Sequence, residues 1–351
     1  MKSKSFLKEK LTRHEVFMVL AIFVLGMIIQ ARSGQFFDSN NLVDMARASI
    51  TPCTFAVGTY MVLASGGIDL SFPAISALTS YIVVVGQLQL DPGGDGNVLL
   101  GYVMCLIIGG LFGALNGFLI SYYRLPAMIV TMGTSNLYWG ILFGPLKNLT
   151  FNLPANLNKW SRTYLFTATN AETGISATLP ALAITTIAII ILAWFLMNKT
   201  MVGRGLYAIG GNIDAASRVG FNVLLLQVLV YALAGGFAGI AGYNRVVTAR
   251  ILNTVFTDGT EMTIIAGVVL GGVRITGGVG TLGGALLGTV FLTILTNSLL
   301  LLGLSPYWAN AATGIIIILG IGVTGLQVMM ERKKRIKRNE EEQMRARGEV
   351  L

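Results

Sequence analysis

Long apolar stretches alternate with shorter polar segments along most of the chain. A bilayer core about 30 Å thick is crossed by about 20 helical residues, so each stretch predicts one membrane-spanning helix. The pattern predicts an all-α, polytopic membrane protein with about ten such helices, at residues 16–31, 46–64, 68–88, 98–121, 126–144, 178–197, 223–243, 260–272, 282–302 and 307–330. The third begins in a glycine-rich break and the eighth is short, so these two have the least defined boundaries and are candidates for broken helices.

Composition supports a membrane protein and argues against an enzyme. Hydrophobic residues make up 54% of the chain and charged residues only 12%, against about 25% charged residues in soluble domains. Cys53 and Cys105 lie in apolar runs, and the single histidine, His14, precedes the first helix. We therefore expect no catalytic residue, metal site or bound cofactor, and a transport protein rather than an enzyme.

The distribution of basic residues predicts the orientation of the helices. With ten crossings both termini lie on one side, and 18 of the 25 Lys and Arg residues then fall on that side. Cytoplasmic segments carry such an excess, so both termini are expected in the cytoplasm. The net charge of +9 is not spread evenly, because basic residues crowd the two ends of the chain, and this makes nucleic acid a poor partner. The basic tail at 332–351 also suits contact with anionic membrane lipid.

This topology divides the chain into one membrane domain and one tail. Residues 1–331 form the domain, with a cytoplasmic N-terminal segment at 1–15 and the largest inner loop at 198–222. Gly109-Gly-x-x-Gly113 in the fourth segment resembles Gly283-Gly-x-x-x-Gly288 in the ninth, five helices later. This spacing fits an inverted repeat, and close packing of helices through small residues explains the same glycines.

The segment 64–73 places a carboxylate at an interruption between two apolar stretches. Asp69 and Ser71 lie within four residues of Gly67, in the sequence Gly66-Gly-Ile-Asp-Leu-Ser71. An ionisable residue at membrane depth usually faces a cavity or a partner. Asp69 either caps the helix that follows it, by accepting backbone N–H bonds, or lines the path of a solute.

Four further polar residues within the predicted helices are candidates for the same path: Asn116, Thr131, Thr134 and Asn297. Such side chains also form hydrogen bonds between helices, which is their commonest role. As a set they suit an uncharged, hydroxyl-rich solute better than an ion, because sites for ions need converging carboxylates and the helices offer only Asp69 and Glu261.

The inner loop predicts a short helix at its centre. Asn212 is a suitable N-cap for a helix from Ile213 to Val219. The loop is either a plain connector or a docking surface, through the residues Gly203, Arg204, Gly210, Gly211, Asn212, Asp214 and Gly220. It is not a phosphate-binding P-loop, because it lacks the Gly-Lys-Ser/Thr ending.

Seven motifs in order along residues 36–322 give the chain a family resemblance. They are Ser65-Gly-Gly-Ile-Asp-Leu-Ser71, Gly113-Ala-Leu-Asn-Gly117, Leu125-Pro-Ala-Met-Ile-Val-Thr-Met-Gly-Thr134, Gly203-Arg-x-Leu-Tyr-Ala-Ile-Gly-Gly-Asn212, Tyr231-x-Leu-Ala-Gly-Gly-Phe-Ala-Gly-Ile-Ala-Gly242, Thr260-Glu-Met-x-x-Ile-Ala-Gly-Val-Val-Leu-Gly-Gly272 and Gly277-Gly-Val-Gly-Thr281. With this set the chain resembles the permease subunits of bacterial ATP-binding-cassette (ABC) importers for simple sugars, of the ribose, xylose, arabinose and galactose type.

The resemblance implies a function and a set of partners. It implies a permease in the bacterial inner membrane that translocates a monosaccharide or related polyol. It also implies a second permease copy, identical or different, a cytoplasmic ATPase subunit that uses the ATP, and a periplasmic or lipid-anchored sugar-binding protein. The coupling region maps onto residues 203–220, and the outer segment 146–177 would receive the binding protein. The chain departs from the family pattern at Ser71-Phe-Pro73, where Ser-Val-Gly is frequent.

A secondary, ion-coupled transporter of a small neutral solute is the alternative, since broken helices and inverted repeats occur there too. Such a transporter normally has buried carboxylates for the coupling ion, and this chain has few.

Overall fold

A computed structural model describes most of the chain, namely residues 13–90, 95–170, 174, 176–301 and the single positions 308, 311, 314, 315, 318 and 322. The predicted tenth helix at 307–330, apart from these single positions, and the basic tail at 332–351 lie outside the described residues, as do residues 1–12.

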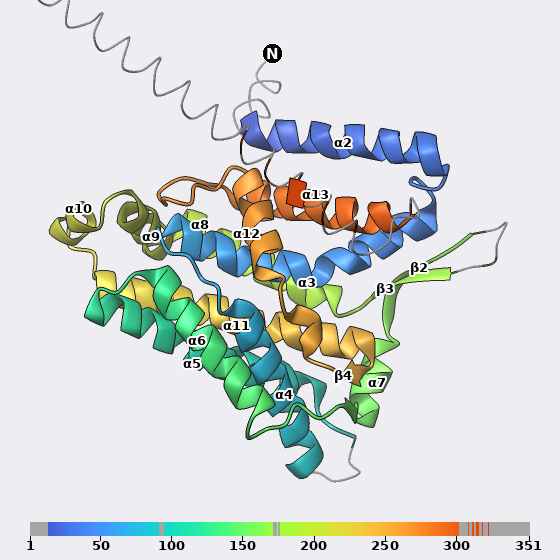
Figure 1. Cartoon of the computed structure of the whole chain (residues 1–351), viewed down its shortest axis with the longest axis horizontal. Coiled ribbons are helices and arrows are strands. Elements are labelled where there is room, and N and C mark those ends of the chain that lie inside the picture. The colour runs from blue at the N-terminus through green and yellow to red at the C-terminus, as the bar shows by residue number, and fades with distance from the viewer. Residues whose placement is uncertain are drawn as a thin grey trace, which may run out of the picture.

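Helices dominate the described chain (Figure 1). The long ones are α2 (Arg13–Ser33), α3 (Ser39–Ala64), α4 (Phe72–Leu90), α5 (Val98–Tyr123), α6 (Ala127–Phe143), α8 (Ala183–Lys199), α11 (Val223–Ala249) and α13 (Leu282–Leu301). The short ones are α7 (Ala155–Ser161), α9 (Met201–Gly211), α10 (Ile213–Arg218), α12 (Glu261–Leu270) and the 3-10 turn η1 (Val255–Thr257).

Fewer helices than expected have both the length and the composition of a membrane span. Among the described residues, five do: α2, α4, α5, α11 and α13. Helices α8 and α9 meet at a bend of 72° and together make a sixth candidate. Helix α3 has 26 residues but a less apolar composition, and α6 and α12 have only 17 and 10 residues. The chain is thus a polytopic helical protein, while ten crossings stay a prediction.

Short strands interrupt the expected all-α architecture. In the segment 146–177 and just after it, β2 (Tyr164–Thr169) pairs with β3 (Ser176–Pro180) in an antiparallel hairpin. Strand β1 (Phe151–Asn152) pairs with β4 (Ile251–Leu252). The sixth predicted segment therefore begins too early: residues 178–180 belong to β3, and α8 starts at Ala183. Residues 178–180 thus form part of the hairpin and do not extend α8.

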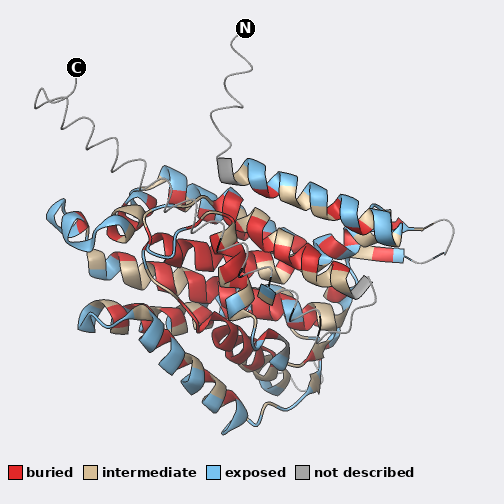
Figure 2. Cartoon of the chain, turned by 45° about the horizontal axis from the view of Figure 1, so that its top comes forward, coloured by how far each residue is buried: buried red, intermediate tan, exposed pale blue. Residues whose placement is uncertain are grey.

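The core lies where α3, α4 and α11 meet, and Figure 2 shows buried residues concentrated in the central helices. Helix α5 packs on α11 through glycines: a Cβ on Gly109 would lie 2.4 Å from the Gly235 carbonyl oxygen, and one on Gly113 would lie 2.0 Å from the Tyr231 carbonyl oxygen. Gly284 and Gly288 bring α13 equally close to α12. Small residues allow such close backbone approach, which drives helix association in membranes.

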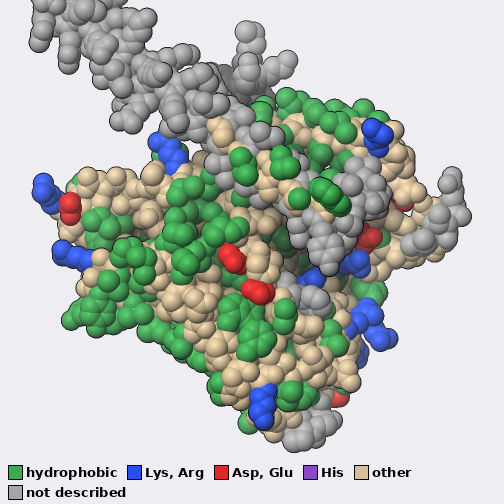
Figure 3. All heavy atoms as spheres, viewed as in Figure 1, with side chains coloured by type: hydrophobic (Ala, Val, Ile, Leu, Met, Phe, Trp, Pro, Cys, Tyr) green, Lys and Arg blue, Asp and Glu red, His purple; other side chains and the backbone are tan. Residues whose placement is uncertain are grey.

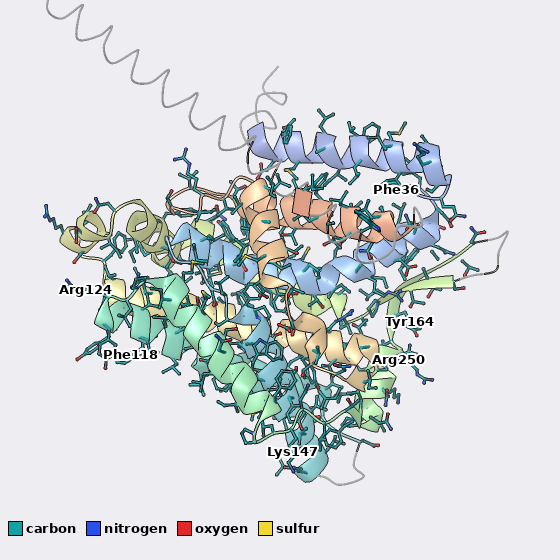
Figure 4. The ribbon with its side chains drawn as sticks, in the orientation of Figure 1. Phe36, Phe118, Arg124, Lys147, Tyr164 and Arg250 are labelled. Carbon is teal, nitrogen blue, oxygen red and sulfur yellow. The ribbon has the colours of Figure 1, made fainter. Side chains whose placement is uncertain are left out.

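The two ends of the molecule carry different loops. At one end, Thr281 donates to Glu15 over 2.8 Å, so the α12–α13 loop meets the start of α2. At the other, Asn170 of the hairpin region donates to Asp38, just before α3, over 3.0 Å. Figure 4 places Arg124 and Tyr164 at opposite ends. On the face in Figure 3, most Lys and Arg side chains lie toward these ends, with hydrophobic surface between them.

Candidate functional site

The break between α3 and α4 is built by local chemistry. Helix α3 ends at Ala64, where Gly66 adopts the left-handed conformation, with φ of +84°. Oδ1 of Asp69 then accepts hydrogen bonds from the Ser71 backbone N–H over 2.7 Å and from the Ser71 hydroxyl over 2.6 Å. Helix α4 begins at the next residue, Phe72. Asp69 therefore caps the start of α4, because its side chain satisfies a donor that the helix cannot.

Five of the six candidate path residues form one cluster around this break, which we call the Asp69 cluster: Asp69, Ser71, Asn116, Thr131 and Thr134. Asn116 of α5 donates to the Ser71 hydroxyl over 2.7 Å. Thr131 of α6 accepts from the Leu70 N–H over 3.1 Å and donates to the Ile68 carbonyl over 3.2 Å. Thr134 lies one turn further along α6 and donates to the Thr131 carbonyl. All five side chains are buried.

Two polar atoms of this region have no hydrogen-bond partner among the described residues. They are Oδ2 of Asp69 and the hydroxyl of Tyr231, both buried. Tyr231 lies against the break, since a Cβ on Gly67 would be 2.3 Å from its hydroxyl oxygen. The Tyr231 hydroxyl and the Asp69 carboxylate therefore both lie at this break. A buried polar group without a partner carries a desolvation penalty, so these two atoms can bind a hydroxyl group that reaches them.

Asn297 lies outside the Asp69 cluster. It belongs to α13, where its side-chain amide donates to the Thr293 carbonyl over 2.9 Å. It lines a separate cavity with residues of α3 and α11. No pattern in the sequence indicated that the six candidates fall into two groups.

The loop at 198–222 contains the predicted helix and a second one. Asn212 accepts the Ala215 N–H over 2.9 Å, which confirms its capping role, and α10 runs from Ile213 to Arg218. Helix α9 before it was not expected. Of the candidate coupling residues, Arg204, Gly211, Asn212, Asp214 and Gly220 are exposed, Gly210 is half-buried and Gly203 is buried.

Gly210 joins this region to the break. Its Cα lies against the end of α3, since a Cβ there would be 2.1 Å from the Ala64 carbonyl oxygen. That oxygen accepts a hydrogen bond from the Gly278 N–H over 3.0 Å. Gly277 also lies against the break, since a Cβ on it would be 2.6 Å from the Gly66 Cα. Helix α9, the α3–α4 break and the α12–α13 loop thus meet backbone to backbone.

Tyrosine hydroxyls complete both regions and were not identified from the sequence. Tyr207 of α9 donates to the Gly280 carbonyl over 2.8 Å and is hydrogen bonded to Tyr60 of α3. Tyr138 of α6 donates to the Phe112 carbonyl over 3.1 Å and lies next to Asn116. Tyr231 begins one of the seven motifs, and this was the signal in the sequence that could have identified it. Tyrosines in apolar helices are otherwise ordinary core residues.

Metal ligands do not gather in the described part of the chain, where no group of three His, Cys, Asp or Glu side chains could hold an ion. The chemistry that the Asp69 cluster offers is hydrogen bonding.

Comparisons with known proteins identify the family. Residues 41–321 match the model of the branched-chain amino acid transport system permease component. The ribose import permease protein RbsC of Escherichia coli (strain K12) is 32% identical over 86% of this chain and 91% of its own length. RbsC of Bacillus subtilis (strain 168) is 32% identical over 90% and 92%, respectively. The autoinducer 2 import system permease protein LsrC of Salmonella typhi is 30% identical over 86% and 82%.

No solved structure shows a significant match to the chain. The family model spans four fifths of the sequence and includes the Asp69 cluster, the α9–α10 region and the glycine contacts between them. The chain therefore belongs to the family of branched-chain amino acid transport system permease components, and it is a transport subunit and not an enzyme.

Proposed function

We propose that this protein is the membrane permease of an ABC importer that translocates a monosaccharide or a related polyol across the bacterial inner membrane. The relatives named as ribose and autoinducer 2 import permeases support an import role for a small hydroxylated solute. The Asp69 cluster supports the same class of solute, because its groups are hydroxyls, amides and one capped carboxylate.

The observation that carries the ATP-driven mechanism is the contact of Gly210 with Ala64. A cytoplasmic ATPase subunit would dock on the exposed surface of α9 and α10, at Arg204, Asn212 and Asp214. Movement of α9 then reaches the α3–α4 break directly, because the two backbones are in contact. The permease itself needs no cofactor, since ATP is used by its partner. Residues 203–220 therefore act as the coupling region, and Asp69 and its neighbours as part of the path.

The opposite end of the molecule suits a sugar-binding protein. The hairpin β2–β3 presents exposed apolar side chains at Tyr164, Leu165 and Phe166. Next to it, Arg250 donates to the Tyr164 hydroxyl over 3.1 Å (Figure 4). With the hairpin end outside and the α9–α10 end inside, the orientation agrees with the basic-residue distribution, with ten crossings and with both termini in the cytoplasm.

The remaining organisation follows the same scheme. Residues 1–331 form one permease domain that pairs with a second copy, identical or different, and the basic tail at 332–351 contacts anionic membrane lipid. The glycine groups of α5 and α13 remain compatible with an inverted repeat, since each mediates close helix packing. The ion-coupled alternative is the weaker proposal, because Asp69 is the one acidic residue classed as buried in the described chain.

Transport by the reconstituted complex tests the proposal. The chain is inserted into proteoliposomes with an ATPase subunit and a sugar-binding protein from the same organism, and uptake of labelled pentoses, hexoses and polyols is measured. Accumulation should require ATP and the binding protein, and should be unaffected by ionophores. Accumulation that follows a proton or sodium gradient without ATP would establish the secondary transporter instead.

A further inference from the structure

A cavity of about 550 Å³ lies apart from the Asp69 cluster, at the hairpin end of the molecule. The first half of α3, the last turns of α11, the segment from η1 to the start of α12, and α13 form its walls. Asp38, just before α3, is hydrogen bonded to Asn170 beside the hairpin, which places the start of α3 at this end. The cavity has the size of a small-molecule site, which is typically about 300–1,000 Å³.

The lining offers uncharged hydrogen-bonding groups beside an aromatic ring. The polar groups come from all four walls: Asn41, Thr51, Thr248, Thr257, Thr260 and Asn297. Phe55 and Pro52 supply apolar surface. A monosaccharide has hydroxyl groups around its ring and C–H groups on its faces, so it needs both kinds of surface. Most of these polar residues were not candidates from the sequence.

Several of these side chains retain acceptor atoms. Thr248 donates its hydroxyl to the Asn244 carbonyl in its own helix over 2.7 Å. Asn297 likewise uses an amide N–H for the Thr293 carbonyl. A threonine hydroxyl has two lone pairs and an asparagine side chain has a carbonyl oxygen. These bonds leave the acceptor atoms available for the hydroxyl groups of a solute.

Three charged side chains also line the cavity. Asp44 and Arg47 form an ion pair with each other over 2.8 Å. Arg245 of α11 also lines the cavity, and its side chain is exposed to solvent. Because Asp44 and Arg47 are paired with each other and most of the other polar groups of the lining are uncharged, the cavity suits a neutral solute.

Two aromatic rings lie between the inner wall of the cavity and the Asp69 cluster. Phe55 packs on Phe72 with ring centroids 4.9 Å apart, and Phe72 directly follows Ser71. Thr257 donates to the Pro73 carbonyl over 3.2 Å, which joins the cavity wall to the first turn of α4. Both rings are buried. The cavity wall and the Asp69 cluster are thus linked through these two buried rings.

We propose that this outer cavity receives a neutral monosaccharide on its way to the Asp69 cluster, and that Phe55 and Phe72 close the path between them. The inference rests on the proposed importer function and adds the site, its solute class and its barrier. It also gives a role to Phe72, at the position where this chain departs from the usual Ser-Val-Gly pattern.

Cysteine modification tests the proposal in the complete transporter. Thr248→Cys and Thr51→Cys each place a thiol in the cavity, on different helices, while the native Cys53 and Cys105 are buried. Leu90→Cys is the control, because Leu90 is 88% exposed and does not line the cavity. Each variant is treated with a membrane-impermeant methanethiosulfonate in vesicles that contain the whole complex, and uptake is compared with that of the same untreated variant.

Modification at either cavity position should abolish uptake, to the level of ATP-depleted vesicles, and should leave uptake by the control variant unchanged. An excess of the transported neutral sugar should slow the reaction of both cavity thiols, and a uronic acid should not. Full uptake after complete modification of both cavity positions would overturn the cavity as a solute site. Stronger protection by the uronic acid would overturn the neutral class. Absence of any sugar uptake by the unmodified wild-type complex would instead refute the importer function on which the inference rests.

Discussion

The contact between Gly210 and the end of α3 allows the proposed coupling route to be tested with a single methyl group. A Cβ on Gly210 would lie 2.1 Å from the Ala64 carbonyl oxygen and 2.5 Å from the Gly278 nitrogen. These two backbone atoms are hydrogen bonded to each other. Gly211, the next residue, has open space at the same position. Gly210→Ala and Gly211→Ala therefore form a matched pair, in which only the first meets an obstacle.

The magnitude follows from the distances. Non-bonded heavy atoms pack best at about 3.5–4.0 Å, so the methyl group must push the two backbones apart by more than about 1 Å. Overpacking of this kind costs about 1–3 kcal/mol. We expect this strain to raise the free energy of the state in which α9 contacts the break, relative to a state in which the two are apart. The equilibrium between these two states then shifts by about 5–150-fold.

The assay is the number of sugar molecules transported per ATP hydrolysed by the reconstituted complex. For Gly210→Ala this ratio should fall by at least about fivefold while ATP hydrolysis continues. The reason is that strain at the contact weakens the coupling of ATP hydrolysis to sugar transport. Gly211→Ala should match the wild-type protein. A thermal melt in detergent checks that both variants are folded. Wild-type stoichiometry in Gly210→Ala, or an equal loss in both variants, would refute coupling through this contact.

Three further predictions concern the cap, the tyrosine link and the helix packing. Asp69→Asn keeps an acceptor for Ser71, so it should retain thermal stability but lose transport. Asp69→Ala should lose transport and also lower the unfolding free energy by about 0.5–2 kcal/mol. Equal melting temperatures for the two variants would contradict the cap. Tyr207→Phe removes the hydroxyl that joins α9 to the α12–α13 loop, a loss of about 0.5–1.5 kcal/mol, and should lower the transport-to-ATP ratio; an unchanged ratio would exclude this bond from the route. Gly109→Ala should destabilise the fold by about 1–3 kcal/mol, because the methyl group clashes with α11, and this should lower the melting temperature. Gly133→Ala should not, because a Cβ there meets open space. Similar melting temperatures for the two variants would show that the packing of α5 on α11 tolerates a methyl group.

Local signals in the sequence predicted much of this molecule correctly. The apolar stretch at 98–121 became α5, and Asn212 caps the short helix that begins at Ile213. The break around Asp69 was also predicted from glycine and cap chemistry. These features depend on residues within a few positions of each other, so the sequence reports them directly.

Competition between local and distant interactions accounts for the differences. Apolar residues at 178–180 pair with β2 and do not extend α8, because a strand partner is available. The stretch at 260–272 forms only the ten-residue α12, which ends at the paired glycines of the α12–α13 loop. Hydrophobicity alone does not distinguish these outcomes.

The sequence by itself determined that this chain is a helical membrane permease and where its main break lies, and it named Asp69 as a candidate for the cap or for the solute path. Only the tertiary structure decided that the Tyr231 hydroxyl lies at the same break as Asp69, and that Asn297 belongs to a separate cavity. It also decided that a Cβ on Gly210 would meet Ala64 while one on Gly211 would meet open space. The physical reason is the range of the interactions. Helix periods and caps are set by neighbours in sequence, whereas these contacts join segments far apart in the chain and depend on how closely their backbones can approach.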